Sequence, residues 1–352
     1  MTKTTTRTIV FLGMTLAAAV SAADWANWRG PNHNGSSTES GLPVKFSKTE
    51  NIAWKIAMPG PSAGTPIIVG NKVFVSSTDP KAEELLALCL DRRTGKELWR
   101  RVVGTGFQLD NRSNYASPSP ACNGEVVAFF YGNGDLAVFD LNGKKLWAKK
   151  IQGDANGFAF QWTFSTSPLL HGGILYMQVL QRNTGVRGHG KANGNESYLL
   201  ALNPKTGKQL WKHNRPSNAK AESLEAFSTP MPYTYKGREE LVIIGGDCLT
   251  GHDPKTGKEL WRYNVLQDRR DANYGDIIVK RGDTIDFIVT SRNYMKPKLR
   301  QGIALKLKIK NPQQDNFTWN PTVRIKKEVA EPRMWKKYVQ VLLLSNELAY
   351  VD

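Results

Sequence analysis

The stretch DPKTGKELWRY, residues 253–263, decides the fold because close copies of it recur along the chain. Asp253 can accept hydrogen bonds from the backbone of its own turn, Pro254 fixes φ at the next position, and Gly257 tolerates the left-handed conformation that closes a hairpin. The residues that follow, ELWRY at 259–263, favour a short strand. The stretch therefore predicts a tight β-hairpin whose second strand carries a large aromatic side chain.

Copies of this hairpin occur at residues 91–99, 140–147 and 203–211, and two weaker ones surround other tryptophans. The six tryptophans of the series, separated by 45, 48, 64, 50 and 58 residues, are Trp54, Trp99, Trp147, Trp211, Trp261 and Trp319. A period of about 50 residues that holds four strands is typical of propeller blades. We expect these side chains to be structural, each filling a gap between neighbouring blades.

The first repeat shows how one blade is built. Strands are predicted at residues 65–69, 72–76 and 85–90, and the tryptophan hairpin supplies the fourth strand. Later repeats also open on a Ser-Pro or Thr-Pro pair, at Ser117-Pro118, Ser167-Pro168 and Thr229-Pro230. Proline is confined to the first residue or the edge of a strand, so its recurrence at one phase supports this division. The predicted fold class is all-β, a β-propeller of four-stranded antiparallel blades.

The amino terminus has the pattern of a secretory signal peptide. Lys3 and Arg7 precede an apolar run at 9–20, and small residues at 21–23 offer a cleavage site. The run is shorter than the roughly 20 apolar residues of a membrane span, and no later segment is apolar enough to cross a bilayer. No cysteine follows the cleavage site to accept a lipid anchor. The predicted localisation is exported, either periplasmic or extracellular.

The formal net charge is +17, which falls to +15 (17 − 2) when Lys3 and Arg7 leave with the signal peptide. This excess permits attraction to acidic polymers or membrane surfaces. The sequence carries no basic and aromatic motif for nucleic acid, so no nucleic-acid partner is expected.

Cysteines and histidines give little functional signal. The three cysteines lie in or beside predicted strands and are expected to be buried free thiols: Cys89, Cys122 and Cys248. The five histidines lie mostly beside Gly or Asn and are expected to be exposed loop residues: His33, His171, His189, His213 and His252. No metal site is predicted from them.

The repeat D-x-x-T-G-K-x-L-W, together with the Ser-Pro strand before it, resembles the pyrroloquinoline-quinone-type (PQQ-like) propeller repeat. That superfamily includes the quinoprotein alcohol dehydrogenases and the outer-membrane assembly lipoprotein BamB. The segment DWANWRGPN at 24–32 further resembles exported PQQ-like repeat proteins of planctomycete-type bacteria. The resemblance covers residues 24 to about 330, and it describes a repeat rather than a proven cofactor.

The resemblance implies seven or eight blades, whereas the repeats here make five complete blades and begin a sixth at residues 331–352. We therefore expect a truncated, open ring. The alternative is a closed six-bladed ring, in which residues 51–57 supply the outer strand that residues 331–352 lack. The corresponding domains are a signal peptide at 1–23, an N-terminal extension at 24–50 and an incomplete propeller at 51–352.

The quinoprotein dehydrogenases hold their quinone over the propeller axis with calcium, a catalytic Asp and a pair of adjacent cysteines. This sequence has no adjacent cysteine pair. Acidic residues do occur in the connections before inner strands, but their spacing does not distinguish a calcium site from solvated charge: Asp110, Asp154, Glu222, Glu225, Asp268 and Asp271. No catalytic residue and no cofactor are predicted, with PQQ and calcium as the alternative.

Loops that enter the inner strands, and those that join second to third strands, meet at one mouth of a propeller. Three of them are unusual here: 108–118, 158–168 and the polar insertion at 180–197, which explains the 64-residue spacing. Exposed aromatic rings beside amides and an arginine suit a carbohydrate or peptide ligand. The candidate ligand-binding residues are Asn111, Arg112, Asn114, Tyr115, Gln161 and Trp162. The alternative is that Tyr115 and Trp162 pack between blades.

Together these features predict an exported, non-catalytic propeller that binds or scaffolds proteins in the cell envelope. Two alternatives remain. One is a PQQ-dependent alcohol dehydrogenase-like oxidoreductase, and the other is a polysaccharide-binding module.

Overall fold

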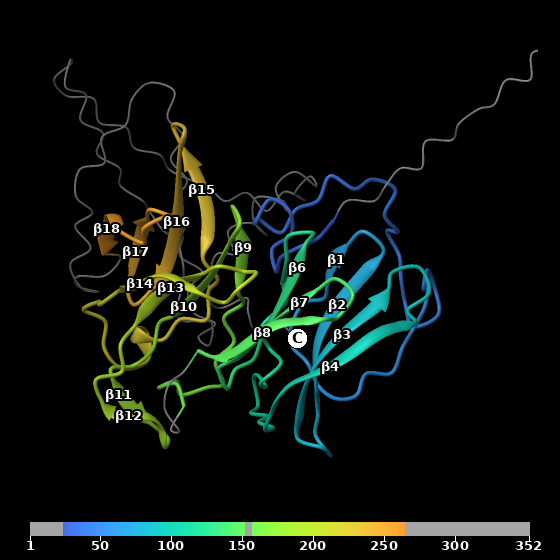
Figure 1. The fold of residues 1–352 in the computed structure, drawn as a ribbon, viewed down its shortest axis with the longest axis horizontal. Helices are drawn as coiled ribbons and strands as arrows, with labels where there is room; N and C mark the ends of the chain where they lie inside the picture. The colour runs from blue at the N-terminus through green and yellow to red at the C-terminus, as the bar shows by residue number, and fades with distance from the viewer. Residues whose placement is uncertain (1–23, 152–156, 265–352) are drawn as a thin grey trace, which may run out of the picture. The chain divides into compact units, whose positions relative to one another are not determined.

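Four sheets follow one another along the part of the chain that the structure describes, residues 24–151 and 157–264 of this computed structural model. Each sheet has four antiparallel strands, and Figure 1 shows them in chain order. The predicted all-β propeller of four-stranded blades is confirmed. The blade count, Trp319 and the ring closure by residues 331–352 lie outside the described residues.

The sheets have the meander topology of propeller blades. The first contains β1 (Ile67–Val69), β2 (Lys72–Asp79), β3 (Glu84–Asp91) and β4 (Glu97–Thr105), and the second β5 (Ala121–Cys122), β6 (Val126–Phe130), β7 (Asp135–Asp140) and β8 (Lys145–Lys150). The third contains β9 (Leu169–His171), β10 (Ile174–Val179), β13 (Tyr198–Leu202) and β14 (Gln209–Asn214), and the fourth β15 (Met231–Tyr235), β16 (Arg238–Gly245), β17 (Cys248–His252) and β18 (Glu259–Asn264).

Two smaller elements interrupt the repeat. A separate hairpin of β11 (Thr184–Val186) and β12 (His189–Asn193) fills the polar insertion between β10 and β13. A short 3-10 helix, η1 (Ala221–Leu224), lies in the connection before β15. Among the described residues no helix is long and apolar enough to span a bilayer.

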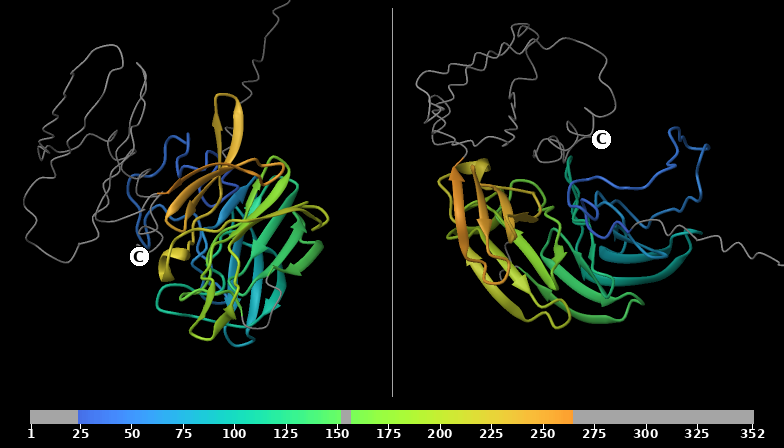
Figure 2. Two further views of the ribbon diagram at one scale, coloured as in Figure 1. Left: turned by 90° about the vertical axis from the view of Figure 1, so that its left-hand side faces the viewer. Right: turned by 90° about the horizontal axis from the view of Figure 1, so that it is seen from above.

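The middle strands of the blades are buried, because β6 packs between two neighbouring sheets, and the first sheet packs on the second sheet with one face and on Trp54 and Ile56 with the other. All five residues of β6 and six of the eight residues of β3 are buried. Between the first two sheets an aromatic core joins Phe74, Trp99, Phe129 and Phe139, with ring centroids 5.8–6.5 Å apart. Figure 2 shows the sheets fanning side by side from the first to the fourth.

The repeated hairpins contact one another from blade to blade through tryptophan. The Trp99 indole N–H donates to the Leu141 carbonyl oxygen at 3.1 Å, and that of Trp147 donates to Pro204 at 2.8 Å. The same contact joins Trp54 to the Arg92 carbonyl oxygen and Trp211 to that of Pro254. Each ring lies on the glycine of the receiving turn, at Gly95, Gly143, Gly207 and Gly257. A repeated hairpin can thus present one tryptophan and receive another.

Within the described residues, 51–57 are in no strand, and the contact with the first blade is made by the Trp54 side chain. The predicted pairing of 51–57 with residues 331–352 lies outside the described residues. The Trp261 indole N–H donates to Glu240 Oε2 of its own blade at 2.5 Å, and the blade that would follow it lies outside the described residues.

The expectation of exposed histidines is wrong for His252, which is fully buried at the end of β17, and the other four are partly buried. The reason is that β17 runs through the Thr-Gly-His stretch into the turn, so His252 faces the blade interior. The three cysteines are buried and free, as predicted.

Candidate functional site

Two kinds of connection lie at the same end of the blades. One joins the fourth, outer strand of a blade to the first, inner strand of the next blade, and the other joins the second strand of a blade to its third strand. We call them the mouth loops, residues 106–120, 157–168, 180–197 and 215–230. In Figure 1 the hairpin of β11 and β12 marks this end. The same end is the one that the sequence predicted to carry a ligand site.

Asp110 fixes the first of these loops to the second. Its Oδ1 accepts hydrogen bonds from the backbone N–H of Arg112 and of Ser113, each at 2.7 Å. Its Oδ2 accepts from the N–H and the hydroxyl of Thr163, at 2.9 and 2.8 Å. Burial alone would raise the pKa of the Asp110 carboxyl, but these hydrogen bonds outweigh it and hold the pKa below its usual range.

A buried ion pair braces the other mouth loops. Arg182 Nε donates to Glu225 Oε1, and the same guanidinium donates to Gln161 Oε1 at 2.8 Å. The Gln161 backbone N–H donates to the second Glu225 oxygen at 3.1 Å. Burial raises the pKa of Glu225 despite these donors, since only 1% of its side chain is exposed. The pair therefore positions loops from three connections.

Trp162 is the aromatic side chain on which the mouth loops converge. The Arg112 Cζ lies 5.0 Å from the centroid of its ring, and the Arg187 Cζ lies 4.9 Å from it. These distances are in the range of cation–π attraction. Both arginines are exposed and Trp162 is partly buried. We call this group the arginine–tryptophan cluster.

The six candidate ligand residues have different surroundings. Arg112 and Trp162 lie together, and Gln161 belongs to the ion-pair network behind them. Asn114 is buried, and its Oδ1 accepts from the Ala116 N–H of its own turn at 2.8 Å. Tyr115 is partly buried and packs on the core between the first two sheets. Asn111 is exposed.

Sequence reasoning missed Arg187, which completes the cluster from the insertion at 180–197. The signal was present, because Val-Arg-Gly-His-Gly at 186–190 is a turn between two short strands and places an arginine at its tip. Its distance of 25 residues from Trp162 hid the contact, since only the folded blade brings the two together.

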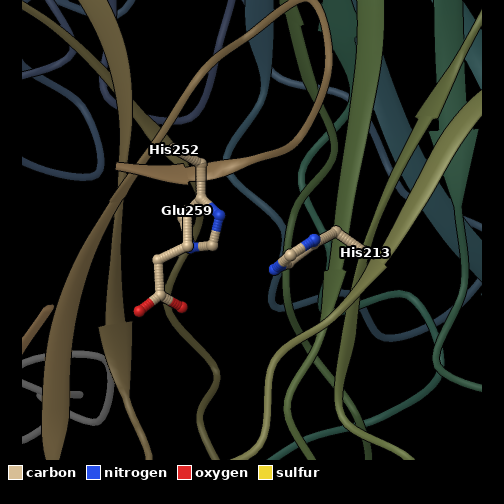
Figure 3. A group of neighbouring side chains, drawn as sticks. All are labelled: His213, His252 and Glu259. Atoms are coloured by element: carbon tan, nitrogen blue, oxygen red, sulfur yellow. The ribbon is translucent and has the colours of Figure 1, made fainter. Parts of the chain in front are cut away.

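Among the described residues, one set of side chains has atoms close enough to hold a metal ion: His213 of β14, His252 of β17 and Glu259 of β18 (Figure 3). Their possible ligand atoms lie within 4.8 Å of one another. His252 Nδ1 is 3.0 Å from the Gly257 carbonyl oxygen, and its Nε2 is 3.0 Å from Thr250 Oγ1. Burial lowers the pKa of His252 to about 4, so its ring is neutral at pH 7.

These partners make the three residues a poor metal site. A carbonyl oxygen can only accept, so His252 Nδ1 donates to Gly257 and leaves Nε2 to accept from the Thr250 hydroxyl. Glu259 accepts two hydrogen bonds from Arg262, at 2.7 and 2.6 Å. A metal ion would have to displace these bonds beside a second guanidinium, that of Arg215, which donates to Thr250 at 2.8 Å. We interpret the set as a hydrogen-bonded support for the turn after β17.

Comparison with known proteins gives one family match. The sequence profile described as outer membrane protein assembly factor BamB matches residues 36–177 and 158–316. A curated relative is tetrathionate hydrolase of Acidithiobacillus ferrooxidans, 26% identical over 227 residues that make up 62% of this chain and 40% of that protein. The chain thus spans less than half the length of that relative.

Solved structures with a similar fold share little sequence with this chain. Europium-containing methanol dehydrogenase has a TM-score of 0.49 at 15% identity, over 69% of this chain and 49% of that one. Quinohemoprotein alcohol dehydrogenase from Comamonas testosteroni has a TM-score of 0.49 at 16% identity, over 70% and 42%. BamB from Moraxella catarrhalis has a TM-score of 0.37 at 15% identity, over 60% and 51%.

Proposed function

This chain belongs to the PQQ-like repeat family whose profile is described as outer membrane protein assembly factor BamB, and we propose that it is an exported propeller that binds a protein partner in the cell envelope. The signal-peptide pattern at residues 1–23 supports export. The family description, which names an assembly factor, favours a protein partner over a small-molecule substrate.

The arginine–tryptophan cluster is the observation that carries this proposal. Tryptophan and arginine are the side chains that contribute most to binding at protein interfaces. Here they lie on loops held by Asp110 and by the pair of Arg182 and Glu225, so the loop backbone loses little conformational entropy when a partner binds. The exposed Arg187 and the net charge of +15 (17 − 2) without the signal peptide favour an acidic surface on that partner.

The described mouth residues do not fit a calcium and quinone centre. Calcium binds six to eight oxygen atoms, as a rule including several carboxylates. Both oxygens of Asp110 already accept protein hydrogen bonds, and Glu225 is bound to Arg182. The three cysteines lie in three different strands. We therefore assign no step to a quinone at this mouth.

The test is affinity capture from a cell-envelope fraction with the wild-type protein and two charge reversals. Arg187→Glu should lose the captured partner because it reverses a charge in the cluster. Lys208→Glu makes the same charge change on the exposed turn between β13 and β14, at the other end of the blade, and should retain it. Equal capture by both variants would contradict a partner at the mouth.

Two further measurements separate the alternatives. The mass of the exported protein should show that residues 1–23 are absent, and an intact Met1 would contradict the signal peptide. Addition of PQQ and calcium should produce no dye-linked oxidation of a primary alcohol. Turnover that a chelator abolishes would favour the dehydrogenase instead.

A further inference from the structure

A second polar cluster lies at the opposite end of the blades, where β9 turns into β10 and β15 turns into β16. It combines residues of the N-terminal extension with residues of the third and fourth sheets. Figure 1 shows the extension in dark blue along this end of the sheets. None of the residues named for this cluster belongs to the mouth loops.

The extension is fixed to the inner strands by backbone hydrogen bonds. Trp25 and Ile68 of β1 exchange two, at 2.7 and 2.9 Å, and the Cys122 N–H of β5 donates to the Ala26 carbonyl oxygen at 2.9 Å. Gly30 has a φ of 72° and the Trp25 ring covers it, so that a Cβ there would lie 2.7 Å from the ring. The loop that follows is therefore held in one place.

Arg29, in the N-terminal extension, has no anionic partner among the described residues. Its Cζ lies 4.9 Å from the centroid of the Trp28 ring, and its Nε is buried and donates no hydrogen bond to any described residue. Burial lowers the pKa of the guanidinium to about 10. A buried polar atom of a charged group normally has a partner, because removal from water is costly.

Two histidines complete the cluster. The rings of His33 and His171 meet edge to face with centroids 5.8 Å apart. Burial, followed by the charges of His171 and Arg29, lowers the pKa of His33 to about 4. His171 Nε2 lies 2.6 Å from Glu239 Oε1, so the Glu239 carboxylate is already paired within the cluster.

We propose that Arg29, His33 and His171 bind a small oxyanion, a free carboxylate or phosphate group. The guanidinium presents a planar fork of N–H donors that matches either group. The two imidazole rings can add donors when protonated, and a bound anion would favour that protonation. The anion would give the partly buried Arg29 guanidinium the anionic partner that no described residue provides. This site is separate from the mouth, so it stands whether or not the envelope partner binds there.

The proposal can be tested on the full chain by NMR, because its five histidines give few ring resonances to resolve. Inorganic phosphate and acetate are titrated separately, with chloride replaced to keep ionic strength constant. We expect saturable shifts of the His33 and His171 resonances, with an increase in the pKa of His33. Phosphate alone, acetate alone or both would each identify the group that binds. No saturable shift with either anion overturns the proposal.

Variants distinguish the site from a general effect of positive charge. Arg29→Gln should weaken the affinity by roughly tenfold or more, as expected for loss of charge-assisted hydrogen bonds. Lys208→Gln removes the same charge from an exposed turn and should leave the affinity unchanged. Equal losses in both variants overturn the proposal. If Arg29→Gln does not fold, Arg29→Lys and His33→Asn replace it, and an unchanged affinity in both is equally decisive.

Discussion

The turns that receive a tryptophan and the mouth loops use the same residue types in different ways. In the repeat, Asp253 Oδ1 accepts from the N–H groups of Lys255 and Thr256, and the turn ends on a glycine that a tryptophan covers. In the mouth, Asp110 Oδ1 accepts similar local hydrogen bonds, from the N–H groups of Arg112 and Ser113. Its second oxygen accepts from Thr163, which belongs to a different mouth loop, residues 157–168.

The tryptophans differ in the same way. Trp147 packs on Gly207 and is fixed by the Pro204 carbonyl oxygen, whereas Trp162 lies beside the exposed side chains of two arginines. An aromatic side chain that recurs at one phase can belong to the packing of blades, because every blade has the same gap to fill. One that occurs once, on a braced loop, is available for recognition. The following variants test this distinction.

The largest expected effect is on a tryptophan of the repeat. Trp99→Ala should lower the free energy of unfolding by about 3–5 kcal/mol, because it opens a cavity in the aromatic core between the first two sheets. Trp162→Ala is the matched control and should cost about 1 kcal/mol or less. Urea unfolding measures both. Equal losses of unfolding free energy in the two variants would contradict the distinction between a tryptophan that packs blades together and one that is available for recognition.

The glycine beneath a tryptophan gives a second test. Gly207→Ala should cost roughly 2–3 kcal/mol, because φ is 69° and the new Cβ would lie 2.7 Å from the Trp147 ring. Gly172→Ala separates the two causes, since its φ is 55° and the new Cβ meets no atom within 4 Å. Thermal unfolding should place this control near 1 kcal/mol. If Gly172→Ala lowered the free energy of unfolding as much as Gly207→Ala, backbone strain at positive φ would explain the whole loss and the contact with the Trp147 ring would add nothing.

Acid should weaken the blade interior through His252. Burial lowers its folded pKa to about 4 from an ordinary value of 6.5, so the unfolded chain binds the proton first. The stabilisation is thus present above pH 6.5 and is lost as pH falls towards 4, by about 2–3 kcal/mol. His33 adds a second loss of the same sign. The free energy of unfolding, measured with urea at several pH values in this range, should fall less steeply with decreasing pH for His252→Gln than for the wild-type protein. An equal pH dependence in the two proteins would contradict the assignment.

The smallest effect is expected at Asp110. Asp110→Asn keeps one acceptor oxygen but loses the charge, and should cost about 1 kcal/mol. Asn111→Ser, at the exposed neighbouring position, should stay within about 0.5 kcal/mol of the wild-type protein. Urea unfolding of the pair shows whether the loop is braced through Asp110. A loss at Asp110 as large as that of Trp99→Ala would make this loop part of the blade core.

Much of the fold follows from local sequence. The predicted strand at 72–76 lies within β2, and the Asp-to-Gly turns occur where the motif places them. His252 was missed because its glycine neighbour suggested a turn, whereas the adjacent strand decides burial. At the mouth, Arg112 and Trp162 were both named from their loops. Their contact with Arg187 depends on how the insertion folds against its blade.

The sequence by itself determined the period, the four-stranded blade and the turn chemistry, because these depend on residues close together in the chain. Tertiary structure decided which side chains meet across blades. It placed Arg187 against Trp162, set the Trp25 ring on Gly30, and brought the charge of Arg29 close enough to lower the pKa of His33. Backbone preferences act over a few residues, whereas these meetings depend on the order and packing of whole sheets, which no single repeat encodes.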